Sequence, residues 1–229
     1  MKQEMGAIKI ASMDFNHLPL LKEILEVAQV PLLLSTGMST LNEIEETVQL
    51  IQKSDHTFAM LHSVSNYPAA FEDLHLQNIK VLQDIYQIPI GFSDHTSSPL
   101  SSAIAVALGA TIIEKHITLD RRDFGPDHPF ALEPPMFKEM VDSIRKVESA
   151  FDPNASFTGP SEREQKNLPL YRRSLVSTRD IRAGETISKE DLKITRPGNG
   201  ILPKYLDLVI GRIARCDIQA ETLIQWEMI

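Results

Sequence analysis

Two histidines with nearby carboxylates are the residues of this sequence best suited to chemistry. Asp94 precedes His95, and Glu114 lies two positions before His116. Neutral imidazoles bind divalent metals and leave coordination positions open for oxygen ligands. Polar residues that merely close two strand ends are the alternative interpretation, and the spacing matches neither a zinc finger nor an HExxH motif. The pattern alone therefore leaves both a metal site and a structural role open.

The segments around the two histidines predict how they are positioned. Residues 89–92 and 111–113 have the apolar or β-branched character of buried parallel strands. Between them, residues 100–108 place leucine, isoleucine and alanine on one helical face. The carboxyl ends of adjacent parallel strands meet at the same end of a sheet, where α/β proteins hold their active sites. We therefore expect His95 and His116 to lie together at that end.

Three similar strand–helix units precede this segment, with strands predicted at residues 7–12, 31–34 and 57–64. A last helix is predicted near residues 137–147. Five βα units in regular alternation imply an α/β fold with a parallel sheet and right-handed crossovers. An open doubly wound sheet and a (β/α)₈ barrel both fit this order, although five units are too few to close an eight-stranded barrel.

The character of the chain changes after residue 151. Residues 152–170 are polar and contain prolines and a glycine, which predicts a linker. Residues 171–229 read as a small, mostly β domain, of a size that is marginally stable alone. Within this domain the sequence DIRA at residues 180–183 is echoed by DIQA at residues 217–220, and Ser188 with Asp191 predicts a one-turn capped helix.

Composition excludes several classes of protein. The 229 residues contain 31 Asp and Glu against 23 Lys and Arg, and this net charge of −8 argues against nucleic acid as the main partner. The single cysteine, Cys216, excludes an intrachain disulfide and fits a reducing compartment. No apolar run approaches the roughly 20 residues of a membrane span or the core of a signal peptide. We therefore expect a cytoplasmic protein that binds no membrane.

Other polar residues follow the predicted strands. Lys9 offers a positive charge for phosphate or carboxylate, and Ser12 offers a hydroxyl from the loop after the first strand. Asp14 is either a base or a cap for the next helix. The segment from Ser35 to residue 37 either cradles an anion or forms an ordinary turn. Arg196, before a Pro-Gly turn, is either a binding group or a surface residue.

Six motifs in a fixed order, KIAS, LSTGMST, GFSDHT, EKHITLDR, GPDH and RPGNG, resemble the sialic acid synthase family. That family includes N-acetylneuraminate synthases and spore-coat polysaccharide relatives, and the resemblance extends over nearly the whole chain. It implies a TIM-type (β/α)₈ barrel followed by a small antifreeze-like (SAF) domain of β-clip fold. It also implies a swapped homodimer in which the SAF domain of one subunit covers the barrel mouth of the other.

The resemblance implies a C–C bond-forming transferase that condenses phosphoenolpyruvate with an N-acetylhexosamine, such as N-acetylmannosamine, and releases phosphate. It implies that His95 and His116 bind a divalent metal, typically Mn²⁺, with Mg²⁺ and Co²⁺ as alternatives, and that Asp14 acts with them in catalysis. The remaining implied substrate-binding residues are Lys9, Ser12, Ser35 and Ser93 for phosphoenolpyruvate, and Tyr67, Asp127 and Arg196 for the sugar.

The resemblance also carries departures. The KIAS strand is about the fourth of the family's barrel but begins here at residue 7, which implies that the first three βα units are absent and that residues 1–151 form a partial barrel. A catalytically inactive remnant, or one half of a split synthase, is therefore the alternative to an enzyme; a carbohydrate-binding tail domain is a third interpretation. At Ser65-Asn66 relatives often place Asn one residue earlier. We further expect Asp94 and Glu114 to orient the two imidazoles.

Overall fold

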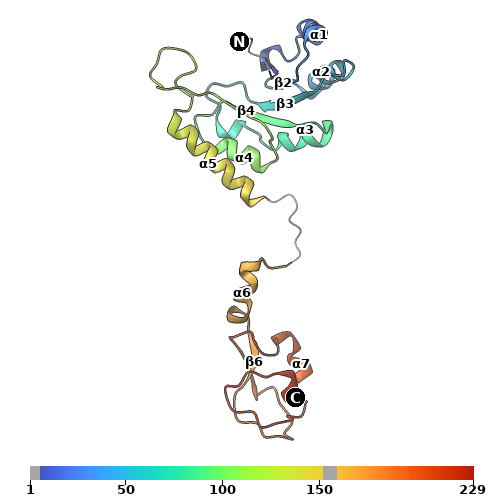
Figure 1. Ribbon diagram of the computed structural model, residues 1–229, viewed down its shortest axis with the longest axis vertical. Helices are drawn as coiled ribbons and strands as arrows, with labels where there is room; N and C mark the ends of the chain where they lie inside the picture. Colours follow the sequence, from blue (N-terminus) through green and yellow to red (C-terminus); the bar gives the residue numbers. More distant parts are fainter. Residues whose placement is uncertain (1–5, 152–158) are drawn as a thin grey trace. The chain divides into compact units, whose positions relative to one another are not determined.

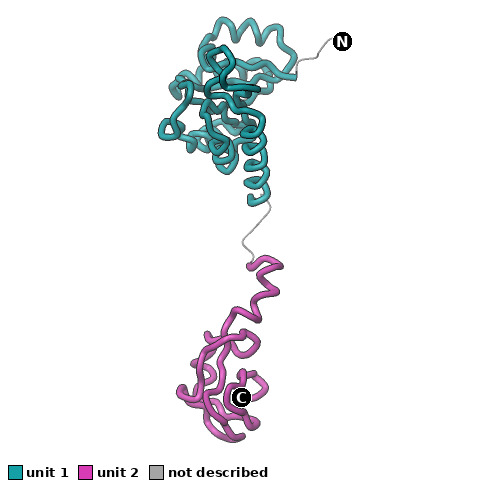
Figure 2. The backbone as a smooth tube through the Cα atoms, turned by 90° about the vertical axis from the view of Figure 1, so that its left-hand side faces the viewer, with its two compact units in different colours: residues 1–155 teal, residues 156–229 magenta. Residues whose placement is uncertain are grey.

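The computed structural model describes residues 6–151 and 159–229. The chain divides into two compact units, residues 1–155 and 156–229 (Figure 2). Part of the linker predicted over residues 152–170 lies outside the described residues. Its described part contains helix α6 (Glu162–Tyr171), which the polar composition did not predict. Ser161 and Glu164 form a capping box at the start of this helix and satisfy its first free backbone N–H groups.

The first unit is built on a parallel sheet of five strands, which confirms the predicted α/β class. Neighbouring strands pair in parallel in the order β1-β2-β3-β4-β5. This sequential order, without reversal, is that of a barrel and not of a doubly wound sheet. The strands are β1 (Ile8–Ile10), β2 (Leu32–Ser35), β3 (Phe58–Ser63), β4 (Ile90–Asp94) and β5 (Ile113–Lys115).

Helices cover one face of this sheet (Figure 1). A single apolar cluster joins residues of the first four helices to alternate strand residues such as Leu34, Met60 and Phe92. The helices are α1 (Leu18–Val27), α2 (Leu41–Gln52), α3 (Asn78–Tyr86), α4 (Leu100–Ala107) and α5 (Pro134–Ala150). Helix α2 begins at the predicted capping box of Thr40 and Glu43. Helices on a single face complete the description of a half-barrel.

Alternation along the strands decides which side chains face the helices and which face the opposite, inner side. In β4, Ile90 and Phe92 belong to the helix-side core, so Gly91 and Ser93 face the inner side. In β5, Ile113 packs with the helix-side core, so Glu114 faces the inner side. The strand predicted at residues 111–113 lies two residues later than expected, with the result that the second histidine follows β5 directly.

The second unit is small, and its described residues combine two short strands and isolated β-bridges with turns and short helices. Strands β6 (Ser174–Ser177) and β7 (Leu192–Thr195) pair antiparallel, and a short helix, α7 (Leu206–Val209), follows. The one-turn helix predicted at Ser188 is wrong. Its side-chain contact with Asp191 exists, but the chain passes directly from a turn into β7.

The sequence echo DIRA/DIQA is a structural pair in this unit. Ile181 and Ile218 exchange backbone hydrogen bonds of 2.8 Å in both directions. Asp180 accepts from the backbone N–H of Ala220 at 2.7 Å, and Asp217 accepts from that of Ala183 at 2.8 Å. Each copy thus caps the other, which gives a physical reason for the repeat. Among the described residues of both units, no helix has the length and apolar character needed to cross a bilayer.

Candidate active site

The two histidines lie side by side at the carboxyl ends of β4 and β5. Their ring centroids are 5.4 Å apart, with ring planes inclined at 57°. His95 is buried, with 7% of its surface exposed, whereas the side chain of His116 is 30% exposed. The final residues of these adjacent parallel strands, Asp94 and Lys115, are partners in the sheet register, so the histidines that follow them lie at the same end of the sheet.

Hydrogen bonding fixes the tautomer of His95. Its Nδ1 lies 2.8 Å from the backbone carbonyl of Val64, and a carbonyl can only accept, so Nδ1 carries the proton and Nε2 has the free lone pair. Burial is the largest effect on the pKa of His95 and lowers it. The hydrogen bond to Val64 opposes this shift, the neighbouring His116 adds to it, and the nearby carboxylates oppose it more weakly. His95 therefore favours the neutral form, which is the form that binds metals.

An aromatic and acidic wall surrounds the second imidazole. Asp127 Oδ2 lies 3.6 Å from His116 Nδ1. The ring of Phe130 meets His116 edge-on at a centroid distance of 4.9 Å, and Phe130 is 4% exposed. The ring of Tyr67 lies between His95 and Phe130 and is tilted against both. Its centroid is 4.3 Å from that of His95 and 5.5 Å from that of Phe130. Aromatic side chains therefore lie next to both histidines, and a carboxylate lies next to His116.

The hydroxyl of Tyr67 remains protonated over the neutral range. Burial raises its pKa, and the negative charges of Asp127 and Glu114 raise it further. About half of the Tyr67 surface is exposed, 49%, so its hydroxyl is free to donate to a bound molecule.

Buried hydroxyls gather at the carboxyl ends of β2 and β3. Within the described residues, Ser35 Oγ and Ser65 Oγ are buried and have no hydrogen-bond partner. Ser12 Oγ accepts from the backbone N–H of Gly37 at 3.1 Å. A Cβ on Gly37 would lie 2.3 Å from Ser65 Oγ and 2.7 Å from Ser12 Oγ, so only glycine fits between them. Unpaired buried hydroxyls are costly and are characteristic of binding sites.

The charged residues of the inner face pair differently from the prediction. Lys9 Nζ lies 3.3 Å from Glu114 Oε2, and this ion pair links β1 to β5 across the inner face. Asp94 instead pairs with Lys115 at 2.9 Å, on the helix side of the sheet. Among the described residues, both carboxylates pair with lysines and neither with an imidazole, so the expectation that Asp94 and Glu114 orient the imidazoles directly, by contact with the rings, is wrong. Strand alternation points Asp94 away from His95, and the acceptors beside the imidazoles are a backbone carbonyl and Asp127.

Comparison with known proteins shows the family of this chain. Residues 1–155 match the NeuB family, and residues 172–229 match the SAF domain. The chain belongs to the NeuB family. It is 40% identical, over 99% of its length, to an uncharacterized protein of Methanocaldococcus jannaschii, and 36% identical, over 97%, to the N,N′-diacetyllegionaminic acid synthase of Legionella pneumophila. It covers 66% and 63% of these two relatives, less than two thirds of their length.

A solved structure is similar over both units of this NeuB-family chain. The crystal structure of the spore coat polysaccharide biosynthesis protein SpsE from Bacillus subtilis has a TM-score of 0.62 and 35% sequence identity. The alignment covers 97% of this chain and 67% of that structure. The SAF prediction for the tail and the family predicted from the six motifs are thereby confirmed.

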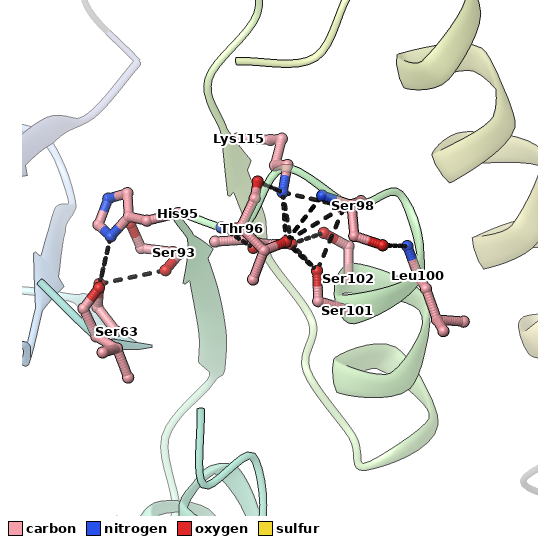
Figure 3. Close-up of polar contacts among 11 residues, drawn as sticks. Ser63, Ser93, His95, Thr96, Ser98, Leu100, Ser101, Ser102 and Lys115 are labelled. Carbon is pink, nitrogen blue, oxygen red and sulfur yellow. Dashed lines mark hydrogen bonds and ion pairs between the residues drawn. The ribbon is translucent and has the colours of Figure 1, made fainter. Parts of the chain in front are cut away.

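The structure brings four of the predicted site residues together and gives the surroundings of the others within their own units. His95, His116, Tyr67 and Asp127 form one cluster, described above. Ser93 is buried beneath it in β4, and its carbonyl accepts from Ser63 Oγ at 3.2 Å (Figure 3). Asp14 is half-buried in the single turn that follows β1. Arg196 belongs to the second unit, where its Nε donates to the carbonyl of Tyr171 at 3.2 Å.

Three residues of the site were missed in the sequence. Phe130 follows the GPDH motif closely, and its aromatic character next to a predicted sugar contact was the available signal. Ser63 Oγ lies 3.5 Å from His95 Nδ1, and the hydroxyl of Ser65 is one of three that are buried without a partner among the described residues, with those of Ser35 and Tyr86. Nothing in the spacing of these serines distinguishes them from ordinary strand-end residues.

The two imidazoles of this NeuB-family site fit a divalent metal that takes its other ligands from bound molecules. Among the described residues, no group of three or more His, Cys, Asp or Glu side chains is arranged to hold a metal alone. His95 has its Nδ1–H committed to Val64, and His116 has Nδ1 beside Asp127. The bond to Val64 leaves Nε2 of His95 with its lone pair free for a metal, as in metal-binding histidines generally.

Proposed function

We propose that this NeuB-family chain carries the catalytic residues of a nonulosonic acid synthase. The reaction joins C3 of phosphoenolpyruvate to the aldehyde carbon of an N-acetylhexosamine; water adds at C2, and phosphate leaves with cleavage of its C–O bond. The observation that carries the proposal is the histidine pair, 5.4 Å apart at two adjacent strand ends, next to buried hydroxyls without partners. The 36% identity to a legionaminic acid synthase supports the same class of product.

His95 and His116 would hold a divalent metal, Mn²⁺ in our proposal, which when bound supplies Lewis-acid polarisation of the sugar aldehyde oxygen. The protein side chains fix the imidazoles for this role. The Val64 carbonyl orients His95, and the carboxylate of Asp127 lies beside Nδ1 of His116. Tyr67 closes the site with its ring against both histidines and offers its hydroxyl to the sugar.

Phosphoenolpyruvate, with its phosphate and carboxylate, suits the hydroxyl-lined region. Lys9 supplies positive charge on the inner face, and Ser12, Ser35 and Ser93 supply hydroxyls around it. The burial of Ser35 Oγ without a partner supports a ligand at this position, because binding satisfies a group that folding leaves unsatisfied. Asp14, in the turn beyond Ser12, is proposed to accept a proton from the attacking water. Holding both reactants in one orientation contributes much of the rate.

The half-barrel is proposed to be part of a (β/α)₈ barrel, whose other strands would pair with the free edges of β1 and β5. The second unit is proposed to cover the barrel mouth of a partner subunit in a homodimer and to bring Arg196 to the N-acetyl group. Charge supports this contact. Residues 1–155 contain 21 Asp and Glu against 11 Lys and Arg, whereas residues 156–229 contain 10 against 12, so the two units carry opposite net charge.

A phosphate-release assay tests the proposed reaction. The full chain is incubated with phosphoenolpyruvate, Mn²⁺ and N-acetylmannosamine or a bacterial diacetamido sugar, and release of phosphate that depends on the sugar is expected. No release with any of these sugars would favour the alternative, an inactive remnant or one half of a split synthase.

The histidine pair is tested separately by metal binding. His95→Ala and His116→Ala are each expected to lower the affinity for Mn²⁺ at least 100-fold, because each removes one of two protein ligands. His17→Ala is the matched control, since this histidine accepts from the backbone N–H of Leu20 at the start of α1 and is not one of the proposed metal ligands. Titration calorimetry measures the affinity, and unchanged affinity in both variants would contradict the assignment.

A further inference from the structure

A buried ion pair links the two strands that carry the histidines. Asp94 in β4 and Lys115 in β5 are partners in the sheet register, and their side chains are 0% and 2% exposed. Lys115 Nζ lies 2.9 Å from Asp94 Oδ2. Each member is the immediate neighbour of one histidine, and strand alternation directs the pair to the helix side and the imidazoles to the inner side.

The pair also fixes the loop that leaves β4. Lys115 donates to the carbonyls of Thr96 and Ser98 at 2.6 and 3.2 Å (Figure 3). Asp94 Oδ1 accepts from the backbone N–H of Thr96 at 2.9 Å. His95 lies between Asp94 and Thr96, so the backbone on both sides of this histidine is held by the same two side chains.

Helix α4 completes the network. The hydroxyls of Ser101 and Ser102 donate to Asp94 Oδ2 at 2.5 and 2.7 Å, and both serines are fully buried. Every polar atom of the ion pair therefore has a partner. Stability alone does not require such a network, because well-packed apolar residues of similar volume often stabilise a fold as well as a buried ion pair does.

We propose that Asp94 and Lys115 are positioning residues that set the separation and orientation of His95 and His116. The proposal rests on the function proposed above. The network is the fixed link between the two strand ends, since it joins β4, β5, the loop after β4 and the first turn of α4. Its loss leaves both imidazoles present but frees the backbone that carries them.

The test separates positioning from stability with a neutral, isosteric double variant of the full chain, Asp94→Asn/Lys115→Met. The variant removes both charges together, keeps the side-chain volumes and leaves an amide oxygen for Thr96. We expect a melting temperature close to that of the wild type and an affinity for Mn²⁺ about 10- to 100-fold lower, as for other losses of support behind metal ligands. Lys138→Met/Asp142→Asn, which removes an exposed pair on α5, is the matched control and is expected to bind as the wild type does.

Two further measurements keep every outcome decisive. Contacts between the ring protons of Tyr67 and His95, measured by NMR without metal, are expected to weaken in the double variant. This measurement tests the positioning role even if the wild type binds no Mn²⁺. Absence of Mn²⁺ binding by the wild type would contradict only the metal assignment. If the double variant does not fold, the variant Ser101→Ala/Ser102→Ala keeps the ion pair but removes two hydrogen bonds to the Asp94 carboxylate. Its affinity for Mn²⁺ is expected to be several-fold lower than that of the wild type. A folded variant with unchanged Mn²⁺ affinity and unchanged ring contacts overturns the proposal.

Discussion

The two units of this NeuB-family chain use buried polar groups for different purposes. In the second unit, Ser174 Oγ donates to the carbonyl of Pro197 and accepts from the N–H of Gly200, both at 2.8 Å. Ser177 Oγ likewise pairs with Gln219 and Thr222. In the first unit, Ser35 and Ser65 have buried hydroxyls without partners in the described residues.

The difference teaches how a binding surface is recognised from its hydrogen bonding. A small domain with a modest core satisfies each buried hydroxyl, because an unpaired one costs a substantial part of its stability. The half-barrel has a larger core beneath its helices and tolerates unpaired hydroxyls at its strand ends. These hydroxyls are available to a ligand, which supports the binding role proposed for the first unit.

The largest effect is expected from breaking the buried ion pair of the first unit. Asp94→Ala leaves Lys115 as a buried charge without a carboxylate, and we expect the free energy of unfolding of this unit to fall by about 3–5 kcal/mol. Hydrogen exchange measured by mass spectrometry resolves the units, with faster exchange expected in β4 and β5 and unchanged exchange in β6 and β7. Equal hydrogen-exchange protection of β4 in the wild type and in the variant would contradict the predicted loss of unfolding free energy.

An intermediate effect distinguishes the serines of the two units. Ser177→Ala is expected to destabilise the second unit by about 1–3 kcal/mol, since it leaves the Gln219 carbonyl and the Thr222 N–H without their partner. Ser35→Ala removes a hydroxyl that folding does not use, so the first unit is expected to keep or gain stability while the affinity for phosphoenolpyruvate falls.

Hydrogen exchange in denaturant measures the stability of each unit in both variants. Titration with phosphoenolpyruvate measures the affinity of the Ser35→Ala variant. The comparison between units fails if Ser35→Ala destabilises its unit as much as Ser177→Ala destabilises the other.

The smallest effect is a dependence of the second unit on pH. The backbone N–H of Ser188, together with the Arg179 guanidinium and the Ser188 hydroxyl, lowers the pKa of Asp191. The ionised form therefore stabilises the fold above the unfolded pKa of about 3.9, and this contribution is lost as the pH falls through the lower, folded pKa. We expect about 1 kcal/mol from this turn-closing contact.

Thermal unfolding of the second unit between pH 6 and pH 2 measures this contribution. Asp191→Asn is expected to unfold at a lower temperature at neutral pH and to show a flatter dependence on pH. A variant with the same pH dependence as the wild type would assign the acid sensitivity to other carboxylates.

Local sequence patterns predicted those elements of the fold that depend on residues close together in the chain. The capping box of Thr40 and Glu43 begins α2 at the expected residue, and the five strands follow one another in a parallel sheet. The boundaries were less accurate: β5 starts two residues late, because pairing with β4 and not side-chain type decides where a short strand begins. Helix α6 was not predicted at all, since its sequence is polar and contains Pro169.

The sequence by itself determined the alternation of strands and helices, the family through its six motifs, and the presence of a histidine at the end of each of two neighbouring strands. Only the tertiary structure decided the partners of these residues. The carbonyl of Val64, 31 positions before His95, accepts a hydrogen bond from its Nδ1–H, and Glu114 pairs with Lys9 across the sheet. Such contacts depend on strand register and on the face to which each side chain points. These follow from packing the helices on one side of the sheet, a property of the whole half-barrel that no single segment contains.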